Sequence, residues 1–356
     1  MLNDLSFRKI LALEATRKIR KNNIELHPLR QLFWESTLRC NLHCRHCGSD
    51  CKKQPDHPDM PLSDFIGVVD SIIPYVNPND VSVIISGGEP LMRDDLEECG
   101  NALFQRGFPW GFVSNGLFLT RDRLDSLMAS GLHSITISLD GFEKDHNWMR
   151  GNAESFDRAT KAIEMLAGES ELLWDVVTCV NGRNYPYLNS FRNYLVNLGV
   201  RTWRLFTVFP MGRAANVPEL QLSNDQFVGL MKFIKHARET GGIHVSYGCE
   251  GFLGEYEGEV RDHFYTCNAG ISIASILVDG SISACPSIRS NFHQGNIYKD
   301  DFMDVWENRF QVFRDRKWAK KDDCASCKFF RYCEGNGIHL RDNDGKLLVC
   351  HYKKLK

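Results

Sequence analysis

Three cysteines near the N-terminus, Cys40, Cys44 and Cys47, have the spacing in this chain that most directly suggests chemistry. Three thiolates at Cys-x3-Cys-x2-Cys spacing can hold three corners of a four-iron cubane, which leaves the fourth iron without a protein ligand. A small molecule could then chelate that iron and be reduced by the cluster, so the open iron suggests an enzyme. The same thiols could instead bind zinc, with His43 or His46 as a fourth ligand.

More cysteines gather in the C-terminal part of the chain, and their total of 13 is odd. No apolar run reaches the roughly 20 residues of a membrane span, and the N-terminus lacks the features of a signal peptide. Clustered cysteines without an export signal indicate metal or cluster ligation in a reducing compartment rather than disulfides. We therefore expect a cytoplasmic protein with no membrane partner. The net charge of -2 over 356 residues gives no general attraction to nucleic acid.

Short β-rich apolar runs alternate with amphipathic stretches from residue 32 onward. This alternation predicts about six β-then-α units and a parallel sheet with right-handed crossovers. The expected fold class is α/β, in which the sheet either curls into a partial (β/α)6 TIM-like barrel or stays doubly wound. In both cases cofactors should lie at the C-terminal ends of the strands. The expected strands are 32–38, 81–86, 110–114, 133–139, 174–180 and 202–208. The expected helices are 62–75, 96–106, 121–129, 156–166, 187–198 and 225–238.

The pattern changes near residue 240. Gly-rich and acidic residues at 241–258 precede a predicted hairpin of 271–278 and 281–284, which turns at Asp279-Gly280. We expect three parts: an N-terminal helical extension (1–30), the barrel (31–240) and a small cysteine-rich α+β domain (241–356).

Small and polar residues follow three of the predicted strands. In Ser86-Gly87-Gly88-Glu89-Pro90 the glycines let the backbone approach a ligand closely, and the carboxylate can accept hydrogen bonds from an ammonium group. Ser114-Asn115-Gly116 and Ser138-Leu139-Asp140-Gly141 end the next two strands, at the same rim of the expected barrel. Asn-Gly and Asp-Gly are also ordinary turn formers, so each of these motifs alone is a weak indication.

The three-cysteine segment resembles the signature of the radical S-adenosylmethionine (SAM) superfamily, and the later motifs follow in the order expected for that family. The resemblance implies that Cys40, Cys44 and Cys47 hold a [4Fe-4S] cluster whose open iron binds SAM. One-electron reduction would then cleave SAM to a 5′-deoxyadenosyl radical. The resemblance further implies SAM-binding roles for Gly87, Gly88, Glu89, Pro90, Ser114, Asn115, Ser138, Asp140, Arg150, Met211 and Gly212.

The C-terminal cysteines resemble the SPASM extension, which holds auxiliary iron-sulfur clusters in enzymes that modify peptides and proteins. One complete ligand set for a cubane would be Cys324, Cys327, Cys333 and Cys350, although four thiolates also make a structural zinc site. Cys267 and Cys285 would belong to a second cluster, with Cys249 as a third ligand and water, substrate or a side chain such as His339 as the fourth. The family commonly has a further cysteine where this chain has Gly337. The sequence is therefore compatible with either one or two auxiliary clusters.

The expected function is hydrogen abstraction from a peptide or protein side chain, giving a crosslink, an oxidation or an epimerisation. A low-potential donor of the flavodoxin or ferredoxin type would supply the electrons. Sulfatase-maturing relatives carry an aspartate where this chain has Pro286, which disfavours that route. Candidates for substrate binding or for a catalytic base are Glu250, Asp262 and Arg341. The alternatives are a small metabolite as substrate, an electron-transfer protein without SAM turnover, and a zinc-stabilised binding protein without radical chemistry.

Overall fold

The computed structural model describes residues 5–248 and 250–356, and a single sheet of ten strands lies at its centre. The strands are β1 (Gln31–Thr37), β2 (Ser82–Gly87), β3 (Trp110–Ser114), β4 (Leu132–Ser138), β5 (Leu173–Val180), β6 (Thr202–Thr207), β7 (His244–Tyr247), β8 (Ile273–Ile276), β9 (Ser281–Ser283) and β10 (Gly295–Asn296). Their order in the sheet is β10-β9-β8-β1-β2-β3-β4-β5-β6-β7. Neighbours from β8 through β1 to β7 are parallel, whereas β9 is antiparallel to both β8 and β10.

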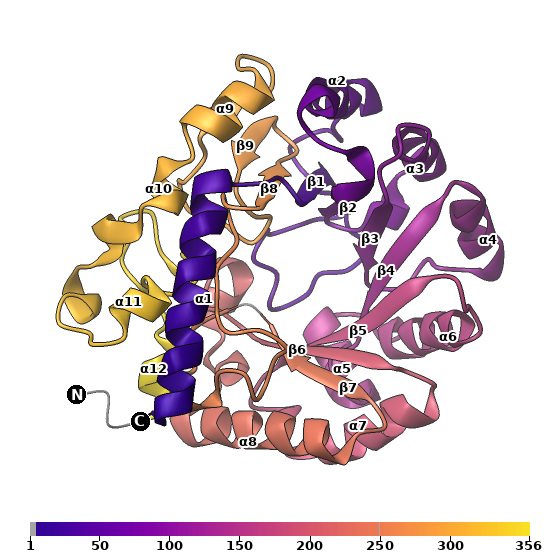
Figure 1. Ribbon diagram of the computed structural model, residues 1–356. Helices are drawn as coiled ribbons and strands as arrows, with labels where there is room; N and C mark the ends of the chain where they lie inside the picture. Colours follow the sequence, from indigo (N-terminus) through magenta and orange to yellow (C-terminus); the bar gives the residue numbers. More distant parts are fainter. Residues whose placement is uncertain (1–4, 249) are drawn as a thin grey trace.

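Helices connect the parallel strands, as parallel pairing requires. They are α2 (Leu62–Ile72), α3 (Leu96–Phe104), α4 (Arg121–Ala129), α5 (Glu143–Arg150), α6 (Ser155–Ala167), α7 (Leu188–Asn197) and α8 (Asn224–Thr240). A further helix, α1 (Phe7–Leu26), precedes β1. The C-terminal part adds α9 (Phe302–Asn308), α10 (Gln311–Arg314), α11 (Phe330–Cys333) and α12 (His351–Lys354). Figure 1 shows β1 to β6 fanning around the centre, with α2, α3, α4, α6, α7 and α8 on the outside.

Alternation along the strands explains this layering. Val83 and Ile85 of β2, for example, are fully buried under the helices, while Ser82 and Ile84 on the other face are only partly buried. Trp34 of β1 stacks on Phe65 of α2, with ring centroids 4.3 Å apart. The fully buried apolar faces of the strands therefore direct the helices to one side of the sheet, and the partly buried faces line the inside of the partial barrel.

The predicted fold class is confirmed, and the six predicted strands and six predicted helices are all present. A seventh parallel strand, β7, continues the barrel beyond the six predicted β-α units. The predicted hairpin forms β8 and β9, and β8 pairs with β1, so the C-terminal part extends the barrel sheet. The division of the chain at residues 30 and 240 stays a prediction.

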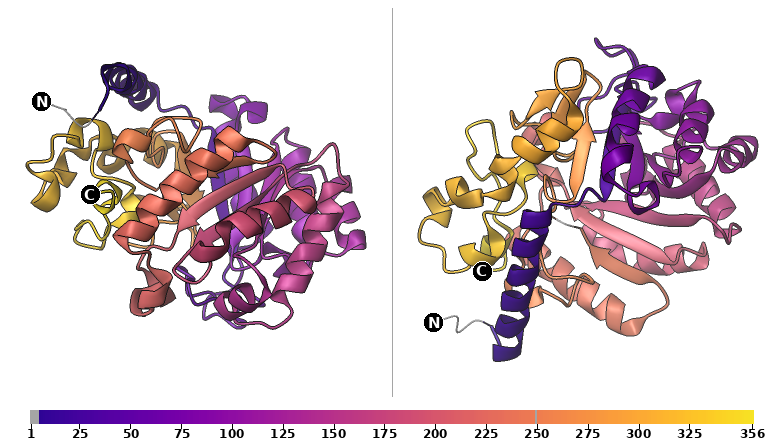
Figure 2. Two further views of the ribbon diagram at one scale, coloured as in Figure 1. Left: turned by 90° about the horizontal axis from the view of Figure 1, so that it is seen from below. Right: turned by 45° about the horizontal axis from the view of Figure 1, so that its top comes forward.

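The N-terminal helix α1 lies on the outside of the molecule, beside the C-terminal elements (Figure 2). Arg20 of α1 donates to the carbonyl of Tyr332 in α11 at 2.9 Å, and the Tyr332 hydroxyl donates to Glu14 at 2.7 Å. These contacts join the N-terminal extension to the cysteine-rich part. Among residues 5–248 and 250–356, no helix has both the length and the apolar character of a membrane span.

Candidate functional site

The loop that carries the three cysteines is residues 38–52, here called the cysteine loop, and it is closed at its base. The backbone N–H of Cys40 donates to the carbonyl of Lys52 at 2.9 Å, and the N–H of Lys52 donates to Leu38 at 3.2 Å. Cys40 and Cys44 are buried and belong to one packed cluster of side chains, against which Cys47 also packs. The sequence prediction that these three thiols share one site is consistent with this arrangement.

Arg213 fastens the cysteine loop to the segment after β6. Its Nε donates to the carbonyl of Cys44 at 2.7 Å, and its backbone N–H donates to the carbonyl of Cys47 at 3.1 Å. Gly212 has a φ of 57°, and a Cβ there would lie 2.5 Å from the Cys47 carbonyl oxygen. Met211 and Gly212, which the sequence predicts to line the cofactor, lie directly before Arg213, the residue that fixes the loop. Only a glycine at position 212 allows this close contact with the loop.

The Gly-Gly-Glu-Pro motif packs directly against the start of the cysteine loop. The backbone N–H groups of Gly88 and Glu89 donate to the carbonyls of Thr37 and Arg39, at 2.8 and 2.9 Å. A Cβ on Gly87 would lie 2.1 Å from the Thr37 oxygen, and one on Gly88 would lie 2.2 Å from the Arg39 oxygen. The glycines thus permit a close approach between two backbone segments, rather than the close approach to a ligand that the sequence predicts.

The Glu89 carboxylate is buried at the centre of a polar network. It accepts hydrogen bonds from the Ser114 hydroxyl at 2.9 Å and from the backbone N–H of Asn115 at 2.7 Å. Burial raises the pKa of Glu89 to about 7, although these hydrogen bonds oppose the shift. The Asn115 side chain donates in turn to the Asn41 side chain of the cysteine loop at 2.8 Å. Predicted residues from two strand ends are thereby joined to the loop.

A second buried network surrounds Arg150, at the end of α5. Its Nε donates to Asp140 at 2.7 Å, and its Nη1 lies 3.9 Å from the Cys44 sulfur. Burial alone would raise the pKa of Asp140, but Arg150, two nearby histidines and the backbone N–H of Cys179 together outweigh this effect and hold the pKa below its usual value. The other Asp140 oxygen accepts from the backbone N–H of Cys179 at 2.9 Å. The buried Ser138, two residues before Asp140, completes the predicted set at this strand end.

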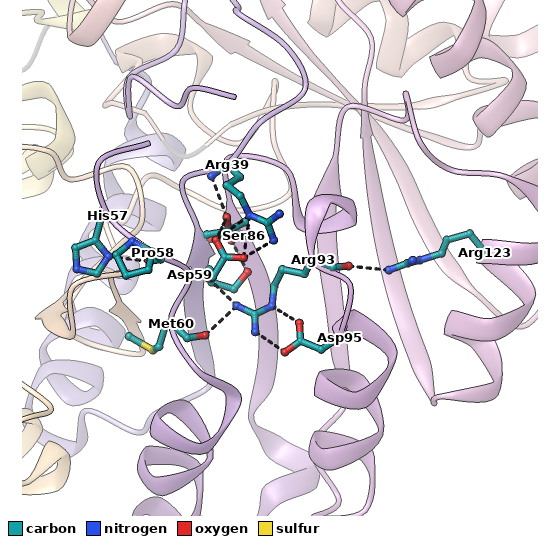
Figure 3. A network of polar contacts seen from close by, with 11 residues as sticks. Arg39, His57, Pro58, Asp59, Met60, Ser86, Arg93, Asp95 and Arg123 are labelled. Atoms are coloured by element: carbon teal, nitrogen blue, oxygen red, sulfur yellow. Dashed lines mark hydrogen bonds and ion pairs between the residues drawn. The ribbon is translucent and has the colours of Figure 1, made fainter. Parts of the chain in front are cut away.

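The exit of β1 toward the cysteine loop is held by two arginines (Figure 3). Arg39 pairs with Asp59 at 2.5 Å. Arg93, which the sequence analysis did not single out, donates through Nη1 to the carbonyls of Ser36 and Met60 at 2.8 and 2.9 Å. Its position directly after the Pro90–Met92 turn gives no sequence pattern that could have revealed this role. These contacts fix where the chain leaves β1.

Four cysteines line one cavity of about 320 Å³ in the C-terminal part: Cys324, Cys327, Cys333 and Cys350. The backbone N–H of Asn336 donates to the Cys333 sulfur at 3.2 Å. Four sulfurs around one cavity are a donor set that fits a cubane. Among the residues that the structure describes, no group of three or more His, Cys, Asp or Glu side chains is arranged to hold a single metal ion. Arg341, one of the predicted substrate residues, lies beside Cys324 and donates to the carbonyls of Gly335 and Gly345.

Cys267 is not among the residues that line this cavity and lies beside the buried guanidinium of Arg316. Burial raises the pKa of Cys267, but Arg316 and the N–H groups of Ala269 and Ile338 outweigh it, so the pKa is lowered. A Cβ on the neighbouring Gly337 would lie 2.5 Å from the His339 ring, so that ring fills the space which a side chain at position 337 would need.

Of the other two cysteines in the predicted second set, the structure describes one. Cys285 follows β9, is partly buried and packs against the main core. Cys249 lies outside the described residues.

Two other candidates for substrate binding lie in different settings. Glu250 is buried in a network in which the Thr207 hydroxyl donates to its carboxylate at 2.6 Å, while His351 lies 3.4 Å away. Asp262 is more than half exposed and pairs with Arg238 at 2.7 Å and with His244 at 2.9 Å. The structure therefore surrounds Glu250 with protein partners and leaves Asp262 on the surface.

Comparison with known proteins gives matches along most of the chain. Residues 34–195 match the family model of the Radical SAM superfamily, and residues 267–328 match the SPASM model, described as an iron-sulfur cluster-binding domain. Mycofactocin maturase MftC of Mycolicibacterium smegmatis is 30% identical over 318 residues, which cover 85% of this chain and 76% of that protein. An AdoMet-dependent heme synthase of Oleidesulfovibrio alaskensis is 24% identical over 353 residues, covering 92% of this chain and 88% of that protein.

A solved structure extends the similarity to the fold. Streptococcus suis SuiB, bound to its precursor peptide SuiA, aligns with a TM-score of 0.70 at 16% identity, over 90% of this chain and 75% of SuiB. The two proteins thus share a fold although only 16% of the aligned residues are identical. The chain belongs to the radical SAM superfamily, carries a SPASM domain, and is an enzyme whose cofactors are SAM and iron-sulfur clusters.

Proposed function

We propose that Cys40, Cys44 and Cys47 ligate the cluster that binds SAM, and that the enzyme modifies a peptide or protein side chain. Bound SAM and a reduced cluster supply the chemistry of this family, reductive cleavage to a 5′-deoxyadenosyl radical that abstracts hydrogen from the substrate. The observation that carries the ligand assignment is the packing of all three thiols in one loop, which is fixed at its base and by Arg213.

The polar residues around the cysteine loop would bind and orient SAM. Arg150 has a fixed guanidinium beside Cys44, held by Asp140, and such a group suits a carboxylate ligand. Glu89 is a buried carboxylate able to accept from an ammonium group. The remaining members of this set are Gly87, Gly88, Pro90, Ser114, Asn115, Ser138, Met211 and Gly212.

The four cysteines of the C-terminal cavity would hold one auxiliary cluster. A second auxiliary cluster would use Cys267 and Cys285, with Cys249 as a further ligand. The lowered pKa of Cys267 supports its role as a ligand, because the thiolate is the form that binds metal. A donor of the flavodoxin or ferredoxin type would reduce the enzyme.

Two relatives support a peptide substrate. MftC is a mycofactocin maturase, and SuiB was solved with a precursor peptide. The match to an AdoMet-dependent heme synthase, which covers 92% of this chain, favours a second candidate, a porphyrin-type metabolite. On a peptide, the modification would be a crosslink, an oxidation or an epimerisation.

The test is turnover by the anaerobically purified holoenzyme with SAM and dithionite. One sample would contain a short peptide encoded beside this gene, and a second would contain an iron porphyrin precursor. The proposal predicts 5′-deoxyadenosine formation that rises with the peptide, together with a mass change in that peptide. A mass change in the porphyrin alone would overturn the peptide assignment in favour of the second candidate.

A further inference from the structure

A single arginine lies on the inner face of the barrel strands. Arg204 is in the middle of β6, and its neighbours Trp203 and Leu205 are fully buried on the face that the helices cover. Since side chains alternate along a strand, Arg204 points to the inside of the partial barrel. Of all residues in β1 to β7, which the structure describes in full, Arg204 is the only lysine or arginine. It is therefore the one permanent positive charge that these strands place inside the barrel.

Asp175 and Thr136, on the two neighbouring strands, hold the Arg204 guanidinium in place. Nε and Nη2 both contact the Asp175 carboxylate, and Nη2 also donates to the Thr136 hydroxyl at 3.0 Å. That hydroxyl donates in turn to Asp175 at 2.7 Å. Within the part of the chain that the structure describes, Nη1 forms no hydrogen bond. The guanidinium is thus oriented by the protein and keeps one N–H₂ group for another acceptor.

Arg204 is accessible although its strand is not at an edge of the sheet. β6 pairs with β5 on one side and with β7 on the other, yet 41% of the Arg204 side chain is exposed. Partly exposed apolar side chains share this inner face of the sheet: Phe33, Ile84, Val113, Val177 and Phe206. Small-molecule sites combine such apolar surface with a few placed polar groups that fix the orientation of the ligand. A ligand inside the barrel can therefore reach Arg204.

The strand register relates Arg204 to the proposed SAM site. Ser138 of β4 is the register partner of Val177 in β5, and Val177 is the partner of Arg204 in β6. Since neighbouring strands lie about 4.8 Å apart, about 10 Å separates the backbones at Ser138 and Arg204. About three residues of extended peptide span that distance. A substrate that contacts Arg204 would therefore also lie close to SAM bound at Ser138.

Building on the proposed function, we propose that Arg204 is a substrate-binding residue, whose guanidinium, oriented by Asp175, donates to a carboxylate of the substrate inside the barrel. An arginine that is held by one carboxylate can bind a second, because its guanidinium carries five N–H groups. Both candidate substrates can supply this group, as an acidic side chain or C-terminus of a peptide or as an acidic substituent of a porphyrin-type metabolite. Arg204 thus selects an anionic substrate of either class.

The test measures KM and kcat for substrate modification by the anaerobic holoenzyme with SAM and dithionite. The probes are the peptide encoded beside this gene and the iron porphyrin precursor, each also prepared with its carboxylates converted to primary amides. With the wild type, the amide form is expected to have a KM about 10- to 100-fold higher than the acid form, the range for a hydrogen bond to a charged group. The kcat should stay within about twofold, because the contact serves binding. The probe that shows this difference identifies the source of the carboxylate.

Arg204→Gln is expected to raise the KM of the acid form to that of the amide form, so that the variant no longer distinguishes the two. Loss of this preference is specific to binding, since a merely structural defect would affect both forms alike. Arg106→Gln is the matched control, because Arg106 also pairs with one carboxylate, Asp70 at 2.6 Å, but outside the barrel. It should keep the wild-type preference. Arg204→Lys, which keeps a positive charge beside Asp175, is the second variant if Arg204→Gln fails to fold, and it should keep part of the preference.

An Arg204→Gln enzyme that prefers the acid form by the wild-type factor would overturn the inference. A wild type that modifies the acid and amide forms with equal KM would overturn it as well, whether or not the variants fold. Absence of 5′-deoxyadenosine from the wild-type reaction would instead refute the proposed function, so the two failures are distinguishable.

Discussion

Gly88→Ala tests whether the Gly-Gly pair is needed for the contact between the motif and the cysteine loop. The new Cβ would lie 2.2 Å from the carbonyl oxygen of Arg39 and 2.7 Å from its carbonyl carbon. Since non-bonded carbon contacts are favourable near 3.5 Å, the residue before Cys40 must move by about 1 Å. A displacement of about 1 Å near reacting groups can lower a rate by on the order of 100-fold.

The assay is the rate of 5′-deoxyadenosine formation with SAM and dithionite, divided by the content of SAM-responsive cluster. Gly67→Ala in α2 is the matched control, because a Cβ there meets no atom within 4 Å, and its rate is expected to equal that of the wild type. A Gly88→Ala enzyme with full iron content and a rate within about twofold of the wild type would refute the reasoning, since no transition-state stabilisation would have been lost.

Three further outcomes follow from the buried and exposed charges. Asp140→Ala leaves Arg150 buried without its counter-charge, so the free energy of unfolding should fall by about 3–5 kcal/mol in anaerobic denaturant titrations, and an unchanged midpoint would contradict this. Burial lowers the pKa of His339 to about 4, so the unfolded chain binds its proton first as the pH falls. The melting temperature should therefore drop between about pH 6.5 and pH 4, and His339→Gln should lose part of this dependence. Asp262→Asn breaks only exposed pairs with Arg238 and His244, so the rate of SAM cleavage should not change, and a clear loss of rate would indicate that Asp262 acts in the site.

The strands and helices of the barrel could be predicted because each carries a strong periodic pattern. The strand at 110–114 and the helix at 121–129 have the same limits in the structure as in the prediction. β7 was missed, since it has only four residues, two of them polar (His244 and Ser246), and follows two glycines. The polar helix α5 was missed for a similar reason, because Trp148 and Met149 are its only apolar residues.

The sequence could predict those parts of the site that lie at the ends of the parallel strands. Glu89, Ser114 and Asn115 follow neighbouring parallel strands, so their side chains meet at one rim. The contact of Arg213 with the cysteine loop could not be predicted, because about 170 residues separate the partners and no local pattern links them.

The measurement that tests the central assignment most directly is 5′-deoxyadenosine formation by the Cys40→Ala, Cys44→Ala, Cys47→Ala triple variant, with iron determined on the same sample. The account predicts that the variant forms none, and that it holds about four fewer irons per chain than the wild type while keeping the iron of the C-terminal site. A triple variant that retains the wild-type iron content and still cleaves SAM would contradict it.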